Sequence, residues 1–179
     1  MSKVILQNVR LAFPNIFRPS EQFDNFGAQL IIEKGSENEK KINAAILEAA
    51  NTKWTAKAES TIKQLKAGNK ICFTDGDAKA EYEGFEGNMA LSATNRQRPT
   101  VVGKDRSPLT EADGIVYAGC YVNAVVDIWP QDNQWGKRIN ASLKGIQFFA
   151  DGDSFTGGGV ASADDFEDLS EGSDAEDFV

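Results

Sequence analysis

The segment IVYAGCYVNAVVDIW, residues 115–129, carries the strongest β-type pattern of the chain. Its even positions, from Val116 to Ile128, are all apolar, whereas the odd positions include tyrosine, asparagine, aspartate and tryptophan. A period of two turns one face of a strand toward the core and the other face outward. The apolar face is built from small residues, which suits the tightly curved wall of a β-barrel. This segment therefore predicts a long barrel strand.

The residues that follow predict an antiparallel partner for this strand. Pro130 is expected to end the first strand, and residues 131–134 are expected to form a four-residue turn. Residues 138–144 again alternate between polar and apolar, and matching the two apolar faces sets the register. The expected core pairs are 126–139, 124–141 and 122–143, and the expected outer pairs are Asp127–Arg138, Asn123–Ser142 and Tyr121–Lys144.

The rest of the body predicts further strands and a helical insertion. Ser36 and Glu39 have the spacing of a capping box, which predicts a helix start at this point, and a second helix is expected over 54–66. A long loop is expected over 96–114. The expected strands cover 4–13, 26–33, 70–74, 88–95 and 100–102.

Charge divides the chain into two parts. The net charge is −8, but ten of the 27 acidic residues and none of the 19 basic residues lie in 151–179. The remaining 17 acids leave residues 1–150 slightly basic, at about +2. Residues 157–159 are three consecutive glycines, and the following sequence has too little apolar surface to fold alone. We therefore predict a folded domain over 1–150 and a disordered acidic tail over 151–179.

Composition excludes several classes of protein. The chain has no histidine, so Ser-His-Asp and Cys-His catalysis cannot be built. Cys72 and Cys120 are far apart in apolar surroundings, which predicts reduced, buried thiols in an intracellular, cytoplasmic protein. We expect no secretory signal, because residues 1–5 lead straight into strand-like sequence. The sequence has no apolar run long enough to span a membrane and no phosphate-binding glycine loop. We expect no cofactor, no metal and no membrane partner.

The body contains the residue types that bind single-stranded nucleic acid without sequence preference. Such binding combines aromatic faces that stack on bases with cations that follow the phosphates. Aromatic and basic residues alternate on the outer face of the predicted hairpin, at its tip, in the long loop and in a glycine-flanked turn. The candidate binding residues are Tyr82, Phe85, Arg96, Arg98, Lys104, Arg106, Tyr117, Tyr121, Trp129, Trp135, Lys137, Arg138 and Lys144.

Each group also has a purely structural interpretation. Tyr117 and Tyr121 could pack beneath the helices, and the two hairpin tryptophans could cap an end of the barrel. Arg138 could pair with Asp127, and the loop arginines could be an ordinary solvated surface.

The end of the tail has the features of a partner-binding segment. An apolar anchor at the end of an acidic run offers a partner both a contact and an electrostatic field to recognise. The same carboxylates resemble a phosphate chain and could compete with DNA for a basic groove. The residues concerned are Asp174, Glu176, Asp177, Phe178 and Val179.

Several motifs resemble those of phage-encoded single-stranded-DNA-binding proteins with an OB-fold core and an acidic C-terminal tail. The resemblance covers most of the chain. It is carried by residues 11–14 with Phe17, by 27–32, 98–99 and 145–148, by the start of the tail at 151–155, and most specifically by 117–124 and 131–138. It implies an OB-fold-like, five-stranded antiparallel barrel, mainly β, with a helical insertion. The implied role is support of the replication or recombination of a phage genome, with DNA on the concave face of the barrel and replication or recombination proteins on the tail. Formation of a homo-oligomer is compatible with the sequence.

Two departures and two alternatives accompany this resemblance. The helical segment falls earlier than the usual OB-fold helix. Tails of this type often end in phenylalanine itself, whereas here Val179 follows Phe178. A DNA-mimic inhibitor would use the tail against a DNA-handling protein. A metal-dependent nuclease would use a carboxylate cluster to hold magnesium. That cluster would comprise Asp75, Asp77, Glu81, Glu83 and Glu86.

Overall fold

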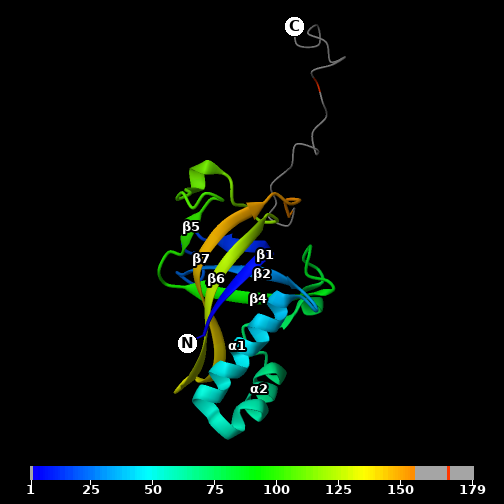
Figure 1. The fold of residues 1–179 in the computed structure, drawn as a ribbon, viewed down its shortest axis with the longest axis vertical. Coiled ribbons are helices and arrows are strands. Elements are labelled where there is room, and N and C mark those ends of the chain that lie inside the picture. Colours follow the sequence, from blue (N-terminus) through cyan, green and yellow to red (C-terminus); the bar gives the residue numbers. More distant parts are fainter. Residues whose placement is uncertain (1, 156–168, 170–179) are drawn as a thin grey trace.

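The computed structural model describes residues 2–155 and residue 169, and it shows a barrel with two helices below one end (Figure 1). The strands are β1 (Ser2–Asn15), β2 (Phe26–Glu33), β3 (Phe73–Asp75), β4 (Asn88–Asn95), β5 (Thr100–Val102), β6 (Tyr121–Asn133) and β7 (Gly136–Ala150). The α-helices are α1 (Glu37–Trp54) and α2 (Ala58–Ala67), and short 3-10 turns cover Thr55–Lys57, Gly76–Lys79 and Glu111–Asp113.

Five of the strands close into a barrel. β1 pairs with β2 and β6, β2 pairs with β4, and β6 pairs with β7, all antiparallel. A parallel bridge between Thr94 of β4 and Ser142 of β7 completes the ring. β3 and β5 extend it outside, on β4 and β7 respectively. The prediction of a five-stranded OB-fold-like barrel with a helical insertion is confirmed, with one parallel contact in place of a wholly antiparallel ring.

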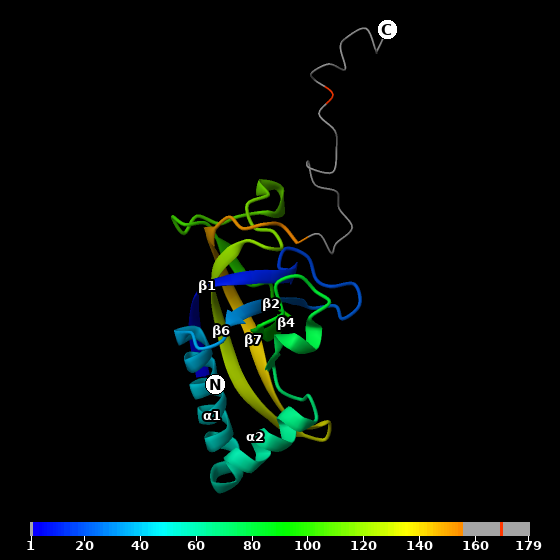
Figure 2. The ribbon, with the colours of Figure 1, turned by 90° about the vertical axis from the view of Figure 1, so that its right-hand side faces the viewer.

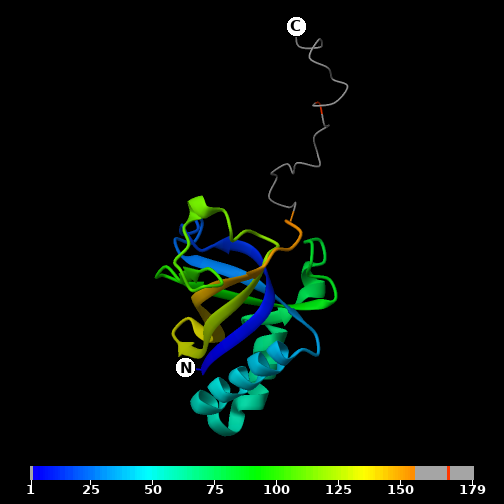
Figure 3. The same cartoon turned by 45° about the horizontal axis from the view of Figure 1, so that its top comes forward.

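The helical insertion begins where the capping box predicts. The Ser36 hydroxyl accepts a hydrogen bond from the Glu39 backbone N–H, and the Glu39 carboxylate accepts one from the N–H of Gly35. The apolar face of α1 lies against the barrel, and Figure 3 shows both helices beneath one of its ends. Trp54 then fastens the end of α1 to the β6–β7 hairpin, since its indole N–H lies 2.8 Å from an Asp132 carboxylate oxygen.

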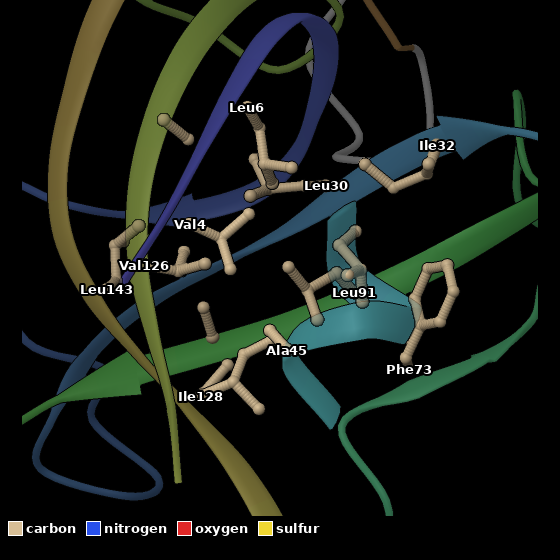
Figure 4. Packing of buried hydrophobic residues seen from close by; sticks show 14 of the residues in the cluster. Val4, Leu6, Leu30, Ile32, Ala45, Phe73, Leu91, Val126, Ile128 and Leu143 are labelled. Atoms are coloured by element: carbon tan, nitrogen blue, oxygen red, sulfur yellow. The ribbon is translucent and has the colours of Figure 1, made fainter. Parts of the chain in front are cut away.

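The core fills the inside of the barrel. Leu6, Leu30, Leu91 and Leu143 come from four different strands and have no exposed surface. Figure 4 shows these side chains converging with Ala45 of α1, so the helix closes the lower end of the same core. Burial of this apolar surface is the main source of stability.

The predicted hairpin has the right faces but the wrong register. β6 continues through Pro130 to Asn133, and the turn has two residues, Gln134 and Trp135. Val126 therefore faces Leu143, and Asp127 faces Ser142, four residues beyond the expected partners. Pro130 is tolerated because β1 pairs with β6 only as far as Ile128, so β6 is an edge strand from that point.

The bounds of β1 and β6 differ from the expected 4–13 and 115–129 at both ends. β1 runs through Pro14 to Asn15 with an irregularity after Ala12, and Phe13 has a φ of 46°. β6 begins only at Tyr121, and residues 115–120 form bends and turns. Gly119, within this segment, has a φ of 108°, which glycine adopts readily.

Among residues 2–155 no helix has both the length and the apolar character needed to cross a membrane.

Candidate nucleic-acid interface

A hollow of about 460 Å³ lies on the outer face of β2 and β4. Residues 27–29 and 92–94 form its floor, and the loop 16–25 and the excursion 76–87 form its walls. Figure 2 shows this loop (blue) and this excursion (green) projecting on the same side of the barrel. We call this hollow the aromatic groove, because three phenyl or phenol rings with exposed faces line it.

The three exposed rings are those of Phe13, Phe23 and Tyr82, with exposed fractions of 45%, 68% and 44%. Phe13 and Tyr82 meet edge to face, with ring centroids 5.1 Å apart. Phe85 lies behind both, at 6.0 Å from Phe13 and 6.2 Å from Tyr82, and is only 1% exposed. Exposed aromatic faces held by a buried ring are well suited to stacking on bases.

Phe13 reaches the groove through a costly backbone conformation. A positive φ is a true outlier for a bulky residue, and such strain collects at functional sites. The irregularity of β1 between Ala12 and Asn15 produces this conformation. A phenylalanine held exposed in this way indicates a binding role more strongly than its sequence context does.

Lys79 supplies the positive charge inside the groove. Its ammonium group donates a hydrogen bond of 2.9 Å to the Gln29 side-chain oxygen and lies 5.8 Å from the centre of the Phe85 ring. Burial lowers the pKa of Lys79 below its usual value. A lysine that is partly desolvated and fixed in place can meet a phosphate with little loss of side-chain freedom.

The structure brings only two of the sequence-predicted binding residues into this groove, Tyr82 and Phe85. Tyr82 presents its ring, whereas Phe85 supports it from below. The other candidates lie in several separate places around the barrel.

The tip of the β6–β7 hairpin carries Trp135, Lys137 and Arg138, all exposed, with Trp135 at 76%. Trp129 lies farther along the outer face of the hairpin, where its indole N–H donates to the Ser142 hydroxyl at 3.0 Å. Figures 1 and 2 place this tip at the end of the molecule that carries the helices.

The loop arginines line hollows of their own. Arg98 donates to the Phe17 carbonyl at 3.1 Å and borders a second hollow of about 640 Å³ on the other side of the loop 16–25. Arg106 and Lys144 line a third hollow outside β6 and β7. Lys144 makes the Asp127 ion pair that the structural interpretation assigned to Arg138, at 3.8 Å. Lys104 lies 5.9 Å from the Phe148 ring centre, and Arg96 is exposed just after β4.

Tyr117 and Tyr121 contact the first residues of the expected tail instead of the helices. The Tyr117 hydroxyl donates a hydrogen bond of 2.8 Å to the Gly152 carbonyl oxygen, and burial raises the pKa of Tyr117. The Tyr121 ring lies close to Gly152. The tail residues 156–168 and 170–179, including the proposed partner-binding end, lie outside the described residues.

The body carboxylates show no sign of a metal centre. Asp75 and Asp77 both form ion pairs with Lys34, at 3.2 and 3.4 Å. The Asp77 backbone N–H and Lys34 lower the pKa of Asp75, and the hydrogen bond with Asp75 raises the pKa of Lys34. Within residues 2–155, no group of three potential ligands is arranged to hold a metal ion.

Sequence reasoning missed Phe13, Phe23 and Lys79 as groove residues. Phe23 had a usable signal, because a phenylalanine within the polar segment Glu21–Asn25 has no apolar neighbours and cannot belong to a core. Phe13 had none, since its outward direction depends on the irregularity in β1.

Comparison with known proteins gives one family. A family model described as the single-stranded-DNA-binding protein of Enterobacter phage Enc34 matches residues 2–179. The protein p50 of Acyrthosiphon pisum secondary endosymbiont phage 1 is 45% identical over 175 residues, covering 94% of each chain.

Solved structures of phage single-stranded-DNA-binding proteins are similar to this chain in fold. The single-stranded-DNA-binding protein of bacteriophage Enc34 in complex with single-stranded DNA is 27% identical, with a TM-score of 0.72 over 86% of this chain and 89% of that chain. Gp2.5, a single-stranded-DNA-binding protein encoded by bacteriophage T7, is similar with a TM-score of 0.58 over 94% of this chain and 98% of that chain. At 11% identity, the latter likeness concerns the fold alone.

Proposed function

Because the chain belongs to the family of the Enterobacter phage Enc34 single-stranded-DNA-binding protein, we infer that it binds single-stranded DNA. It acts by binding and not by catalysis, as its family does. We propose that the strand lies in the aromatic groove and that Phe13, Phe23 and Tyr82 stack on bases. The observation that carries this proposal is the pair of exposed rings, Phe13 and Tyr82, fixed at 5.1 Å over buried Phe85.

Five of the other sequence-predicted residues enter the proposal as contacts along the path of the strand. Arg98 donates to the Phe17 carbonyl in the loop 16–25, which forms a wall of the groove. Arg96 follows Asn95, which pairs with Phe26 at the end of that loop, so both arginines are suited to phosphates that leave the groove. Trp135, Lys137 and Arg138 form an exposed aromatic and basic group at the hairpin tip. We propose that these groups extend the site. We also propose that the protein acts in phage DNA replication or recombination in the cytoplasm of the host.

Titration of labelled poly-dT and of a matched duplex, followed by fluorescence anisotropy, tests this function. We expect tighter binding of the single strand, because stacking needs unpaired bases. If about four phosphates are neutralised, the slope of log affinity against log salt concentration is expected to be about −3. A flat salt response would contradict a cationic path, and absence of binding to either DNA would favour the DNA-mimic alternative.

We further propose that the acidic tail competes with DNA and recruits replication or recombination proteins. Eight of its ten acids lie after Phe155, and eight carboxylates in a short segment resemble a phosphate chain. The apolar Phe178 within the acidic end offers an anchor to a partner protein.

Removal of residues 156–179 is expected to tighten poly-dT binding about tenfold at low salt, because fewer carboxylates compete for the cations. The difference in affinity between the two chains should vanish at about 1 M salt, where the screening length is only about 3 Å. The cut is made after Phe155 because residues 151–155 contact the body. Equal affinities of the two chains at low salt would reject competition by the tail, and so would weaker binding by the shortened chain.

A further inference from the structure

Residues 151–155 are fitted closely to the barrel, although their composition resembles that of the tail. The Gly152 N–H donates to the Tyr117 hydroxyl at 3.1 Å, and the Phe155 N–H donates to the Ala118 carbonyl at 3.1 Å. A Cβ at Gly119 would overlap the Asp153 carbonyl oxygen, and a Cβ at Gly152 would overlap the Gly119 carbonyl oxygen. The two glycines therefore allow this segment to approach the body more closely than any other residue would.

Arg10 of β1 fixes the segment from below. Its guanidinium donates a hydrogen bond of 3.0 Å to the Gly119 carbonyl and one of 2.6 Å to the Asp153 carbonyl. The same group lies 4.3 Å from the centre of the Phe155 ring. A guanidinium held by two carbonyls and stacked on an aromatic ring is fixed in position, and it fixes the ring in turn.

Phe155 connects the segment to the aromatic groove. Its ring packs against a small apolar cluster on the outer face of β1, β2 and β4, formed by Ala12, Ile31, Phe85 and Ala90. This cluster is separate from the interior core of the barrel. Phe85 of the cluster is the buried ring that supports Phe13 and Tyr82.

We propose that residues 151–155 belong to the DNA-binding body and that Phe155 is a positioning residue for the aromatic groove. Phe155 packs against the cluster that contains Phe85, and Phe85 in turn contacts the two exposed rings that we propose to stack on bases. The tail thus begins beside the groove at a fixed point. This inference rests on the proposed location of the DNA in the groove.

A double-mutant cycle in the full-length chain tests the inference. Phe155→Ala is expected to raise the Kd for poly-dT about fivefold, and to change it less than about twofold when Tyr82→Ala is already present, since residues that share a packing partner, here Phe85, couple. The matched control is Phe149→Ala, which removes a phenylalanine that is 42% exposed and is expected to leave the Kd unchanged.

The outcomes separate this inference from the proposed function. If Tyr82→Ala leaves the Kd unchanged, the location of the DNA in the groove is wrong. If Tyr82→Ala weakens binding and Phe155→Ala has no effect, or has the same effect in both backgrounds, the positioning role alone is overturned. If Phe155→Ala is unfolded at the assay temperature, the cycle is measured with Phe155→Leu, which removes the ring but keeps an apolar side chain, and the same coupling is expected.

Discussion

Replacing Phe13 and Tyr82 together by alanine is expected to reduce the affinity for poly-dT by about 2–6 kcal/mol, since each base–aromatic stack contributes about 1–3 kcal/mol. This corresponds to a loss of at least about 30-fold. Both rings are roughly half exposed, so their removal leaves no large cavity in the barrel core. Fluorescence anisotropy gives the Kd, and thermal unfolding followed by circular dichroism verifies that the double variant remains folded.

Two single variants show whether the loss belongs to the groove. Ile5→Ala removes an apolar side chain that is 49% exposed on β1 and lines the hollow outside β6 and β7, and it is expected to leave the Kd unchanged. Trp135→Ala removes the 76% exposed ring at the hairpin tip and is expected to weaken binding by about 1 kcal/mol or more if the strand extends there. A larger loss from Trp135→Ala than from the double variant would move the principal site to the hairpin.

The fold class could be predicted because alternation along a strand is a local property. Residues 116–128 show in sequence which positions face the core, and every even position from Val122 to Ile128 is buried in the structure. The start of α1 was predictable for the same reason, because the capping box of Ser36 and Glu39 lies within four residues.

The register of the hairpin could not be predicted because it depends on neighbours distant in sequence. In the structure Pro130 pairs with Ile139 of β7, but the Ile139 backbone N–H donates to the Lys70 carbonyl at 3.2 Å and not to β6. The pair therefore has no backbone hydrogen bond that would need an N–H on residue 130. The nitrogen of Pro130 then points to an edge that β1 leaves open. A rule that ends strands at proline fails where the missing N–H would face solvent.

The binding site was predictable in residue type but not in place. Aromatic and basic residues were the correct chemistry to seek, yet the barrel distributes them over several surfaces. Tyr82 lines the groove, Tyr121 contacts the segment 151–155, and Trp129 bonds to Ser142 on the outer face of the hairpin. The groove itself forms from loops 16–25 and 76–87, which only the closed barrel brings together.

Leu30→Ala is expected to lower the free energy of unfolding by about 2–5 kcal/mol, because it leaves a cavity in a closely packed core. Leu30 has no exposed surface and lies on the inward face of β2, the strand that joins β1 to β4. Leu47→Ala provides the control, since Leu47 is 41% exposed on α1 and its removal should cost less than about 0.5 kcal/mol beyond helix propensity.

Guanidinium unfolding followed by tryptophan fluorescence measures both variants. The midpoint of Leu30→Ala should fall while the slope of the transition stays constant, since the surface exposed on unfolding changes little. Gln29 and Ile31, the sequence neighbours of Leu30, point outward to the groove and to the Phe155 cluster. Saturating poly-dT should therefore raise the stability of Leu30→Ala by linkage, provided that the folded variant keeps the groove intact. Equal losses from Leu30→Ala and Leu47→Ala would contradict a closed, close-packed barrel beneath the groove.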